Sequence, residues 1–220
     1  MPRNPPPADR SAPLTKRGEE LLDTLEGIVL SEGFEHLNVS DMAARLACSK
    51  RTLYELAPSR KLLLLRVVGR FFARIRDDAA SIGECDADAR QQVYDYLQIG
   101  VRAAERLSPA AVRDMQAWPP AHTVWQEHVA LRVQGLRRII EAGIRSGEFK
   151  DIHPAFVAEI VFASINRLRE PDFCTATSLT ISQAFDELYR LLLLALAPDS
   201  TRVPRSRSTR GRSGAQRTQH

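Results

Sequence analysis

Apolar residues recur at intervals of three and four along most of this chain, and the pattern predicts an all-α protein. The first amphipathic helix is expected from about residue 14, with its apolar face formed by Leu21, Leu22, Leu25, Ile28 and Val29. Its opposite, polar face is expected to carry the acidic residues Glu19, Glu20, Asp23 and Glu26. Gly33 is placed to end this helix, because glycine tolerates the left-handed conformation.

Two short helices are predicted after Gly33. Asn38 stands three residues before Asp41, which is the spacing of a capping box at a helix start. Ser49 can cap a second short helix, for which Leu53 supplies the apolar anchor. A short helix, a turn and a second short helix with polar side chains form the pattern of a helix-turn-helix.

A longer helix is predicted from Ser59 to Ile75 or beyond, and its apolar residues lie on more than one side. Such a helix must be covered by two sets of neighbours, so we expect two domains to share it. Further helices are predicted near residues 93–101, from 108, from 120 to 146, from 153 to 168 and from about 179 to 197. Residues 156–168 are apolar nearly all round, which favours burial on both sides.

Charge is distributed unevenly along the 220 residues. Residues 198–220 contain six arginines and one aspartate, a net charge of +5, so the rest of the chain carries −1 of the total of +4. The high pI therefore reflects a tail, and DNA binding cannot be argued from overall charge. We expect residues 1–13 and 198–220 to be disordered. The tail either adds non-specific attraction to DNA or is a solvated end, and its composition fits both.

Several other classes of protein are disfavoured. No apolar run reaches the roughly 20 residues that cross a bilayer, and the N-terminus lacks the apolar core of a signal peptide, so a cytoplasmic protein without membrane contact is expected. Three cysteines (Cys48, Cys85 and Cys174) and the six-residue spacing of His122 and His128 predict neither a disulfide framework nor a metal site. No nucleophile-base pair or phosphate-binding glycine loop is found, so neither an enzyme nor a cofactor is expected.

The run from Ser31 to Leu64, SEGFEHLNVSDMAARLACSKRTLYELAPSRKLLL, resembles the DNA-binding domain of TetR-type transcriptional regulators. The resemblance covers roughly residues 16–65. Its most specific pieces are Gly33-Phe34, Asp41-Met42-Ala43, Ser49 to Tyr54, and Pro58 to Leu63. The chain departs from the family pattern at three positions: Ala47 replaces the usual turn glycine, Ala57 the usual phenylalanine, and Arg60 the commoner lysine.

The resemblance implies specific DNA contacts. Lys50 and Arg51 are the long donors of the predicted recognition helix, and arginine can bind guanine O6 and N7 with two hydrogen bonds, so these two are predicted to contact bases. Contacts to phosphates are predicted for the remaining polar residues of this region: Thr52, Tyr54, Ser40, Arg45, Arg60 and Lys61. Without the resemblance, the same side chains would equally fit an ordinary solvated helix face.

The resemblance also implies a division of the chain into a helix-turn-helix head, residues 14–62, and a ligand-binding and dimerisation body, residues 63–197. Candidate pocket residues are the aromatic and polar side chains Met115, Trp118, His122, Trp125, Phe162 and Asn166. Dimer contacts are predicted from the last two long helices, through Phe156, Ile160, Phe185, Leu188 and Leu192. The alternative is that these two helices are core helices of a monomer.

Together these features predict a homodimeric, sequence-specific DNA-binding regulator that acts as a repressor and leaves its operator when an unknown small-molecule effector binds. The expected partners are double-stranded operator DNA, a second copy of the chain and the effector. The alternative is an activator or architectural factor of the same fold, controlled by a protein partner or by no ligand.

Overall fold

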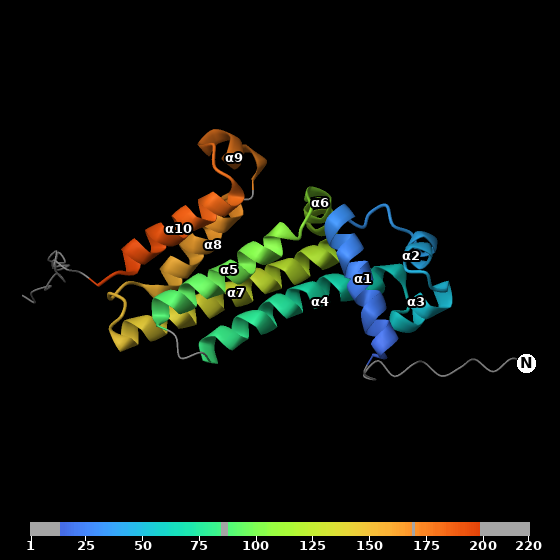
Figure 1. The fold of residues 1–220 in the computed structure, drawn as a ribbon, viewed down its shortest axis with the longest axis horizontal. Coiled ribbons are helices and arrows are strands. Elements are labelled where there is room, and N and C mark those ends of the chain that lie inside the picture. The colour runs from blue at the N-terminus through green and yellow to red at the C-terminus, as the bar shows by residue number, and fades with distance from the viewer. Residues whose placement is uncertain (1–13, 85–87, 169, 199–220) are drawn as a thin grey trace, which may run out of the picture.

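The computed structural model describes residues 14–84, 88–168 and 170–198, and these form α-helices and one short 3-10 turn without any strand. Figure 1 shows a small head of α1 to α3 at one end and a body of longer helices extending from it. The helices are α1 (Lys16–Glu32), α2 (Val39–Arg45), α3 (Lys50–Leu56), α4 (Arg60–Ala80), α5 (Ala89–Glu105), α6 (Pro109–Ala117), α7 (Pro119–Ser146), α8 (Pro154–Leu168), α9 (Pro171–Thr177) and α10 (Ile181–Leu196), with the 3-10 turn at Ser81–Glu84.

The all-α prediction is confirmed, and the helix starts follow their caps. Asn38 and Asp41 form the predicted capping box of α2: the Asn38 side chain accepts from the Ser40 and Asp41 amides, and Asp41 accepts from the Asn38 amide. Ser49 caps α3 by accepting from the Thr52 amide at 3.1 Å. These side chains satisfy amides that have no partner within their own helix.

The connecting helix α4 is buried against both parts of the molecule, as its apolar pattern predicted. Its buried residues recur every three to four positions, mostly as adjacent pairs, along most of its length: Leu63, Leu64, Val67, Val68, Phe71, Phe72, Ile75 and Ala79. Helix α4 packs against α1 in the head and against α5 and α7 in the body. A shift of α4 would therefore change the packing of the head and of the body together.

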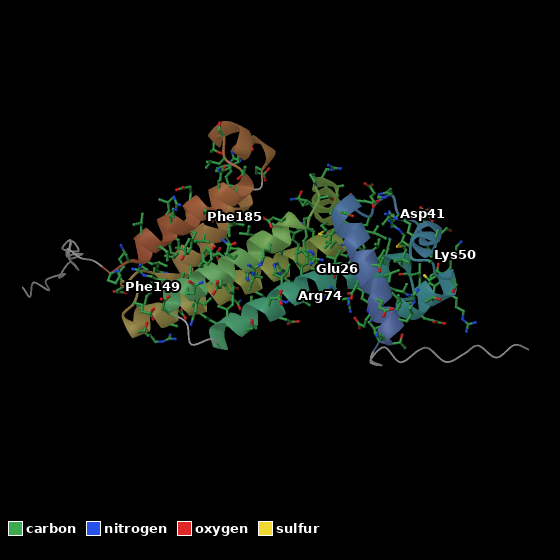
Figure 2. The ribbon with its side chains drawn as sticks, in the orientation of Figure 1. Glu26, Asp41, Lys50, Arg74, Phe149 and Phe185 are labelled. Atoms are coloured by element: carbon green, nitrogen blue, oxygen red, sulfur yellow. The ribbon has the colours of Figure 1, made fainter. Side chains whose placement is uncertain are left out.

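Glu26 departs from the sequence prediction. It was expected on the polar face of α1, but it is only 1% exposed. Arg74 of α4 contacts its carboxylate at 3.3 Å, and Arg106 at the end of α5 donates to it at 2.8 Å. Figure 2 shows Glu26 and Arg74 close together where α1 crosses α4. The position is buried because α4 and α6 pack against α1 and Arg106 reaches it from just after α5, which the periodicity of α1 alone does not reveal.

A second contact between head and body is made by Asp114 of α6. Its Oδ2 accepts from the backbone amides of Phe34 at 2.5 Å and Glu35 at 2.8 Å, just after α1 ends. Gly33 has φ +79°, and a Cβ there would lie 2.5 Å from the same carboxylate oxygen. Glycine is therefore required at residue 33 by its backbone conformation and by the close approach of α6.

The body is held together by close contacts at two glycines of α7. A Cβ at Gly135 would lie 2.1 Å from the Tyr96 hydroxyl, which donates to the Arg132 carbonyl at 2.8 Å. A Cβ at Gly143 would lie 2.3 Å from the ring of Phe149, a residue only 3% exposed. Both glycines bring neighbouring segments closer to α7 than any larger residue allows.

Most predicted helices are found near their expected positions, with one addition. The break at Trp118-Pro119 separates α6 from α7, and Gly147 ends α7 in the left-handed conformation. The short helix α9 was not predicted. The proposed arm at 1–13, most of the tail at 198–220 and Cys85 lie outside the described residues. Within the described ranges, no helix is long and apolar enough to cross a membrane.

The close contact at Gly143 gives a stability prediction. Gly143→Ala should lower the melting temperature, because overpacking against Phe149 and Ala89 costs about 1–3 kcal/mol and exceeds the helix-propensity gain of up to about 1 kcal/mol. The control is Gly69→Ala in α4, where an added Cβ meets nothing within 4 Å and should stabilise the fold. Thermal unfolding of both variants checks this, and an equal gain in both would contradict the packing argument.

Candidate DNA-contact surface and internal pocket

The outer surface of the head carries most of the predicted DNA contacts, on α3. Lys50 and Arg51 are exposed, and Arg51 has 90% of its side chain accessible and forms an i,i+4 ion pair with Glu55 as its sole partner within the described ranges. Tyr54 is 51% exposed although it is a large aromatic residue. Figure 2 shows Lys50 at the end of the head away from the body. The apolar side of α3 is buried through Leu53 and Leu56, so it presents its polar side to solvent.

The other predicted contact residues differ in how available they are. Ser40 and Lys61 are exposed, and the Thr52 hydroxyl lies 2.9 Å from that of Ser49 at the start of α3. Arg45 is exposed but forms a two-bond ion pair with Glu32 of α1. Its hydrogen bond to Glu32 raises the pKa of Arg45, and the same bond lowers the pKa of Glu32. Arg45 would have to exchange this partner to reach a phosphate.

Arg60 is committed to the fold of the head. Its guanidinium donates to the carbonyls of Leu37, of Phe34 at 2.6 Å and of Glu35 at 3.0 Å. These carbonyls belong to the segment that joins α1 to α2, so Arg60 holds that segment against the start of α4. Its phosphate contact stays a prediction, but the structure gives this side chain a different and sufficient role.

The turn between α2 and α3 is unusual at Ala47, which has φ +46°. A side chain in this left-handed region costs roughly 1 kcal/mol relative to glycine, which explains why the resembled family places glycine here. Cys48 follows and is partly buried, and this burial raises the pKa of its thiol. A raised pKa keeps the thiol protonated and less reactive near neutral pH.

An internal pocket lies in the body, between α4, α5, α7, α8 and α10. Its walls are mainly apolar, with Phe71, Phe72 and Ile75 supplied by the connecting helix α4. His128 stacks on Phe72 with ring centroids 4.6 Å apart. The cavity volume is about 40 Å³, which accommodates a few water molecules. Any larger occupant must therefore displace some of the wall side chains, three of which belong to α4.

Of the six predicted pocket residues, Trp125, Phe162 and Asn166 line this pocket. Met115 is fully buried in the α6 packing, because α6 turns its apolar face toward α1 and α7. Trp118 packs edge-on against Phe34 and lines a separate surface groove between head and body. His122 approaches Gln126 one turn along α7. These three residues therefore do not line the internal pocket, and Trp118 belongs instead to the junction of head and body.

The sequence analysis missed the most polar wall of the pocket. Arg132 is 3% exposed and donates from Nη2 to the Tyr96 carbonyl at 2.6 Å, with its guanidinium 3.9 Å above the Tyr96 ring. The signal was present in the sequence. Residue 132 lies three after Val129 and four before Leu136, which places an arginine on the apolar face of α7.

The predicted dimer residues fall into two groups. Phe156 and Ile160 of α8 are 62% and 50% exposed, and Leu191 and Leu194 of α10 are 63% and 73% exposed. By contrast, Phe185 and Leu192 are 5% exposed and pack into the core of their own chain, and Leu188 is half-buried. The prediction is corrected for Phe185 and Leu192: the helix face that points outward from α10 is the one with Leu191 and Leu194. We call the surface formed by Phe156, Ile160, Leu191 and Leu194 the α8/α10 face.

Residues 115–189 match the sequence model described as the tetracyclin repressor-like, C-terminal domain. This region runs from the end of α6 into α10 and includes half of the residues that line the pocket, together with Phe156 and Ile160 of the α8/α10 face. No curated protein matches the sequence of the chain.

Solved structures of transcriptional regulators share the fold. A putative TetR-family regulator from Rhodococcus sp. aligns with a TM-score of 0.65 and 18% identity, covering 82% of this chain and 99% of its own. A putative regulator from Saccharomonospora viridis in complex with choline gives 0.69 and 16%, covering 84% and 100%. Reduced NemR from E. coli gives 0.68 and 15%, covering 85% and 100%. The common feature is the arrangement of head and body along nearly the full length of these proteins.

The contacts of Arg60 generate a prediction for the head. Arg60→Ala should lower the free energy of unfolding by about 2 kcal/mol, because it removes charge-assisted hydrogen bonds to backbone carbonyls. Lys61→Ala is the control, since Lys61 is exposed and makes no hydrogen bond or ion pair with the described residues. Urea unfolding checks both variants. An unchanged midpoint for Arg60→Ala would contradict the structural role and leave only the predicted phosphate contact for this residue.

Proposed function

From a chain with the fold of TetR-family regulators and a tetracyclin repressor-like C-terminal domain, we propose a homodimeric, sequence-specific DNA-binding repressor that is released from its operator by a small molecule. One observation supports this most directly. The connecting helix α4 begins beside the DNA-contact surface of the head and supplies three of the side chains that line the pocket in the body.

DNA recognition is assigned to α3. Its exposed cationic side chains, Lys50 and Arg51, lie on the helix that enters the major groove in a helix-turn-helix. Arg51 forms only an exposed ion pair with Glu55, a type of pair that contributes little and is easily exchanged for a base. Contacts to phosphates are proposed for Thr52, Tyr54, Ser40 and Lys61.

Dimerisation is assigned to the α8/α10 face. Four large apolar side chains that are at least half exposed lie on two helices that pack side by side, and apolar patches of this kind mark interaction sites. Helices α8 and α10 pair at the part of the body distant from α3 (Figure 1). Two copies joined through this face would present two recognition helices, as a two-fold operator with half-sites ~34–36 Å apart requires.

Release by a ligand follows from the size of the pocket. A ligand shifts an equilibrium only if it binds one state more tightly than the other. Because the cavity holds only a few waters in this conformation, an organic ligand fits only a state in which the walls have moved. Phe71, Phe72 and Ile75 are walls on α4, so that state also tilts the helix on which the head packs.

The alternative is an activator or architectural factor of the same fold that responds to no ligand. The pocket, with charged and aromatic side chains on its walls, favours the ligand-responsive protein over this alternative.

Base recognition by Arg51 is tested with duplexes that the unmodified protein selects from a random-sequence library. Arg51→Ala should weaken binding to the selected duplex about tenfold or more and broaden base preference, because a bidentate base contact is lost. Arg137→Ala is the matched control, since Arg137 forms the same kind of exposed i,i+4 ion pair, with Glu141, on α7. Fluorescence anisotropy measures both, and an equal loss for the two variants would refute the assignment.

Dimerisation is tested by placing a carboxylate on the α8/α10 face. Phe156→Glu and Leu194→Glu should each convert a dimer to a monomer at micromolar concentration, because a charge would be buried without a partner. Leu62→Glu is the control: Leu62 is 46% exposed but lies at the start of α4 in the head. Sedimentation equilibrium gives the mass, and a monomeric unmodified protein would contradict the proposed dimer.

A further inference from the structure

The pocket contains a buried positive charge that the fold uses only in part. Arg132 projects from α7 and is 3% exposed. One edge of its guanidinium is engaged: Nη2 donates to the Tyr96 carbonyl and the plane lies over the Tyr96 ring. The other nitrogen, Nη1, is buried and has no hydrogen-bond partner among the described residues.

No acidic group among the described residues compensates this charge. Arg132 forms no salt bridge within the described part of the chain, and the pocket lining contains no aspartate or glutamate. Burial lowers the pKa of Arg132, opposed only by its interactions with Tyr96, yet an arginine stays charged at neutral pH. A buried charge without an opposite charge is costly, and a partner of opposite sign relieves that cost.

The surroundings of Arg132 define the rest of a ligand. From α4, α7 and α8 the pocket wall presents aromatic side chains such as Phe72, Trp125 and Phe162. Asn166 supplies a neutral amide, and His128 is stacked on Phe72. A cation would be repelled by Arg132, and a neutral molecule could offer Nη1 an acceptor but would leave the buried charge of Arg132 without an opposite charge.

We propose that the effector is an amphiphilic organic anion, with a carboxylate or comparable acidic group bound by Arg132 and an apolar body held between the aromatic walls. This inference rests on the proposed ligand control of the same pocket and adds the chemical class of the ligand. The hydrogen bond from the charged guanidinium favours a negatively charged group on the ligand, and the apolar walls favour an apolar body for the rest of it.

A purely structural role for Arg132 accounts for less of its geometry. Bridging α5 to α7 through Tyr96 requires only Nη2 and the face of the guanidinium, and the Tyr96 hydroxyl already joins the two helices by donating to the Arg132 carbonyl. That bond is made by the Arg132 backbone and survives any change of its side chain. The remaining donor, Nη1, is the part of the residue that the fold leaves without a role.

The experiment compares ligands that differ only in their charged group. Isothermal titration calorimetry of the full chain would use two sets of probes: octanoate, 1-octanol and octylammonium, and 2-naphthoate with 2-naphthol. At least one carboxylate should bind with a dissociation constant below about 1 mM and at least tenfold more tightly than its neutral counterpart. Octylammonium should bind more weakly than 1-octanol.

Two variants locate the preference at Arg132. Arg132→Met should abolish the tenfold preference while binding of the neutral probe is kept, and its melting temperature should stay the same or rise because an uncompensated buried charge is removed. Asn166→Asp, an exposed substitution on the pocket wall, should weaken carboxylate binding by charge repulsion and leave alcohol binding unchanged. Gln134→Glu is its control, because it adds the same charge to α7 outside the pocket.

The proposal is overturned if neither carboxylate binds, if neutral probes bind as tightly as the carboxylates, or if both Arg132→Met and Asn166→Asp keep the preference. Should Arg132→Met fail to fold, Asn166→Asp against Gln134→Glu decides the matter alone. DNA binding is measured separately on the duplex selected from the random library. A carboxylate that binds with the Arg132-dependent preference but does not release that duplex supports the anion site and refutes its role as the site of an effector, whereas absence of any selected duplex refutes the proposed DNA-binding function.

Discussion

The architecture depends on one buried carboxylate, that of Glu26, where three helices meet. Arg74 from α4 and Arg106 from the end of α5 both contact it, and Arg74 also pairs with Asp23 one turn earlier on α1. The hydrogen bond from Arg74 lowers the pKa of Asp23, which keeps that carboxylate ionised and paired in the folded protein. Removing one partner of a buried ion pair is far more costly than the pair is stabilising. The head, the connecting helix and the body are therefore restricted to relative positions that keep Glu26 paired.

The same helix that the ion pairs fix, α4, also lines the small pocket in the body. Phe71 and Phe72 are adjacent on α4, and Phe71 also lies beneath the guanidinium of Arg106, which binds Glu26. Displacement of these rings by a ligand acts on the same helix that the ion pairs hold against α1. Packed interfaces of this type switch between discrete arrangements because a close-packed interior cannot deform gradually. The pocket walls and the ion-pair cluster therefore share α4, the helix on which the proposed release by a ligand depends.

Sequence reasoning was most successful where a local rule decides the outcome. Asn38 and Asp41 specify a capping box without reference to the rest of the fold, and the apolar residues around α4 already required two sets of neighbours. It was least successful where a residue's environment comes from distant segments. Glu26 was expected on a polar face, Phe185 and Leu192 were expected as dimer contacts, and Met115, Trp118 and His122 were expected as pocket walls. In each case the environment of the side chain depended on which helix lies opposite, and the rotation of a helix about its own axis is set by packing.

By itself the sequence determined the helical class, the helix boundaries at its caps and prolines, and the exposed cationic face of α3, because these depend on neighbours within a few residues. The tertiary structure alone decided which charged side chains are buried and which groups they contact. It pairs Glu26 with two arginines that lie 48 and 80 residues away, and it leaves Arg132 beside Tyr96 without an acidic partner. Periodicity places a residue on a face of its helix, but only the packing of other helices determines whether that face meets water, a counter-ion or an apolar wall.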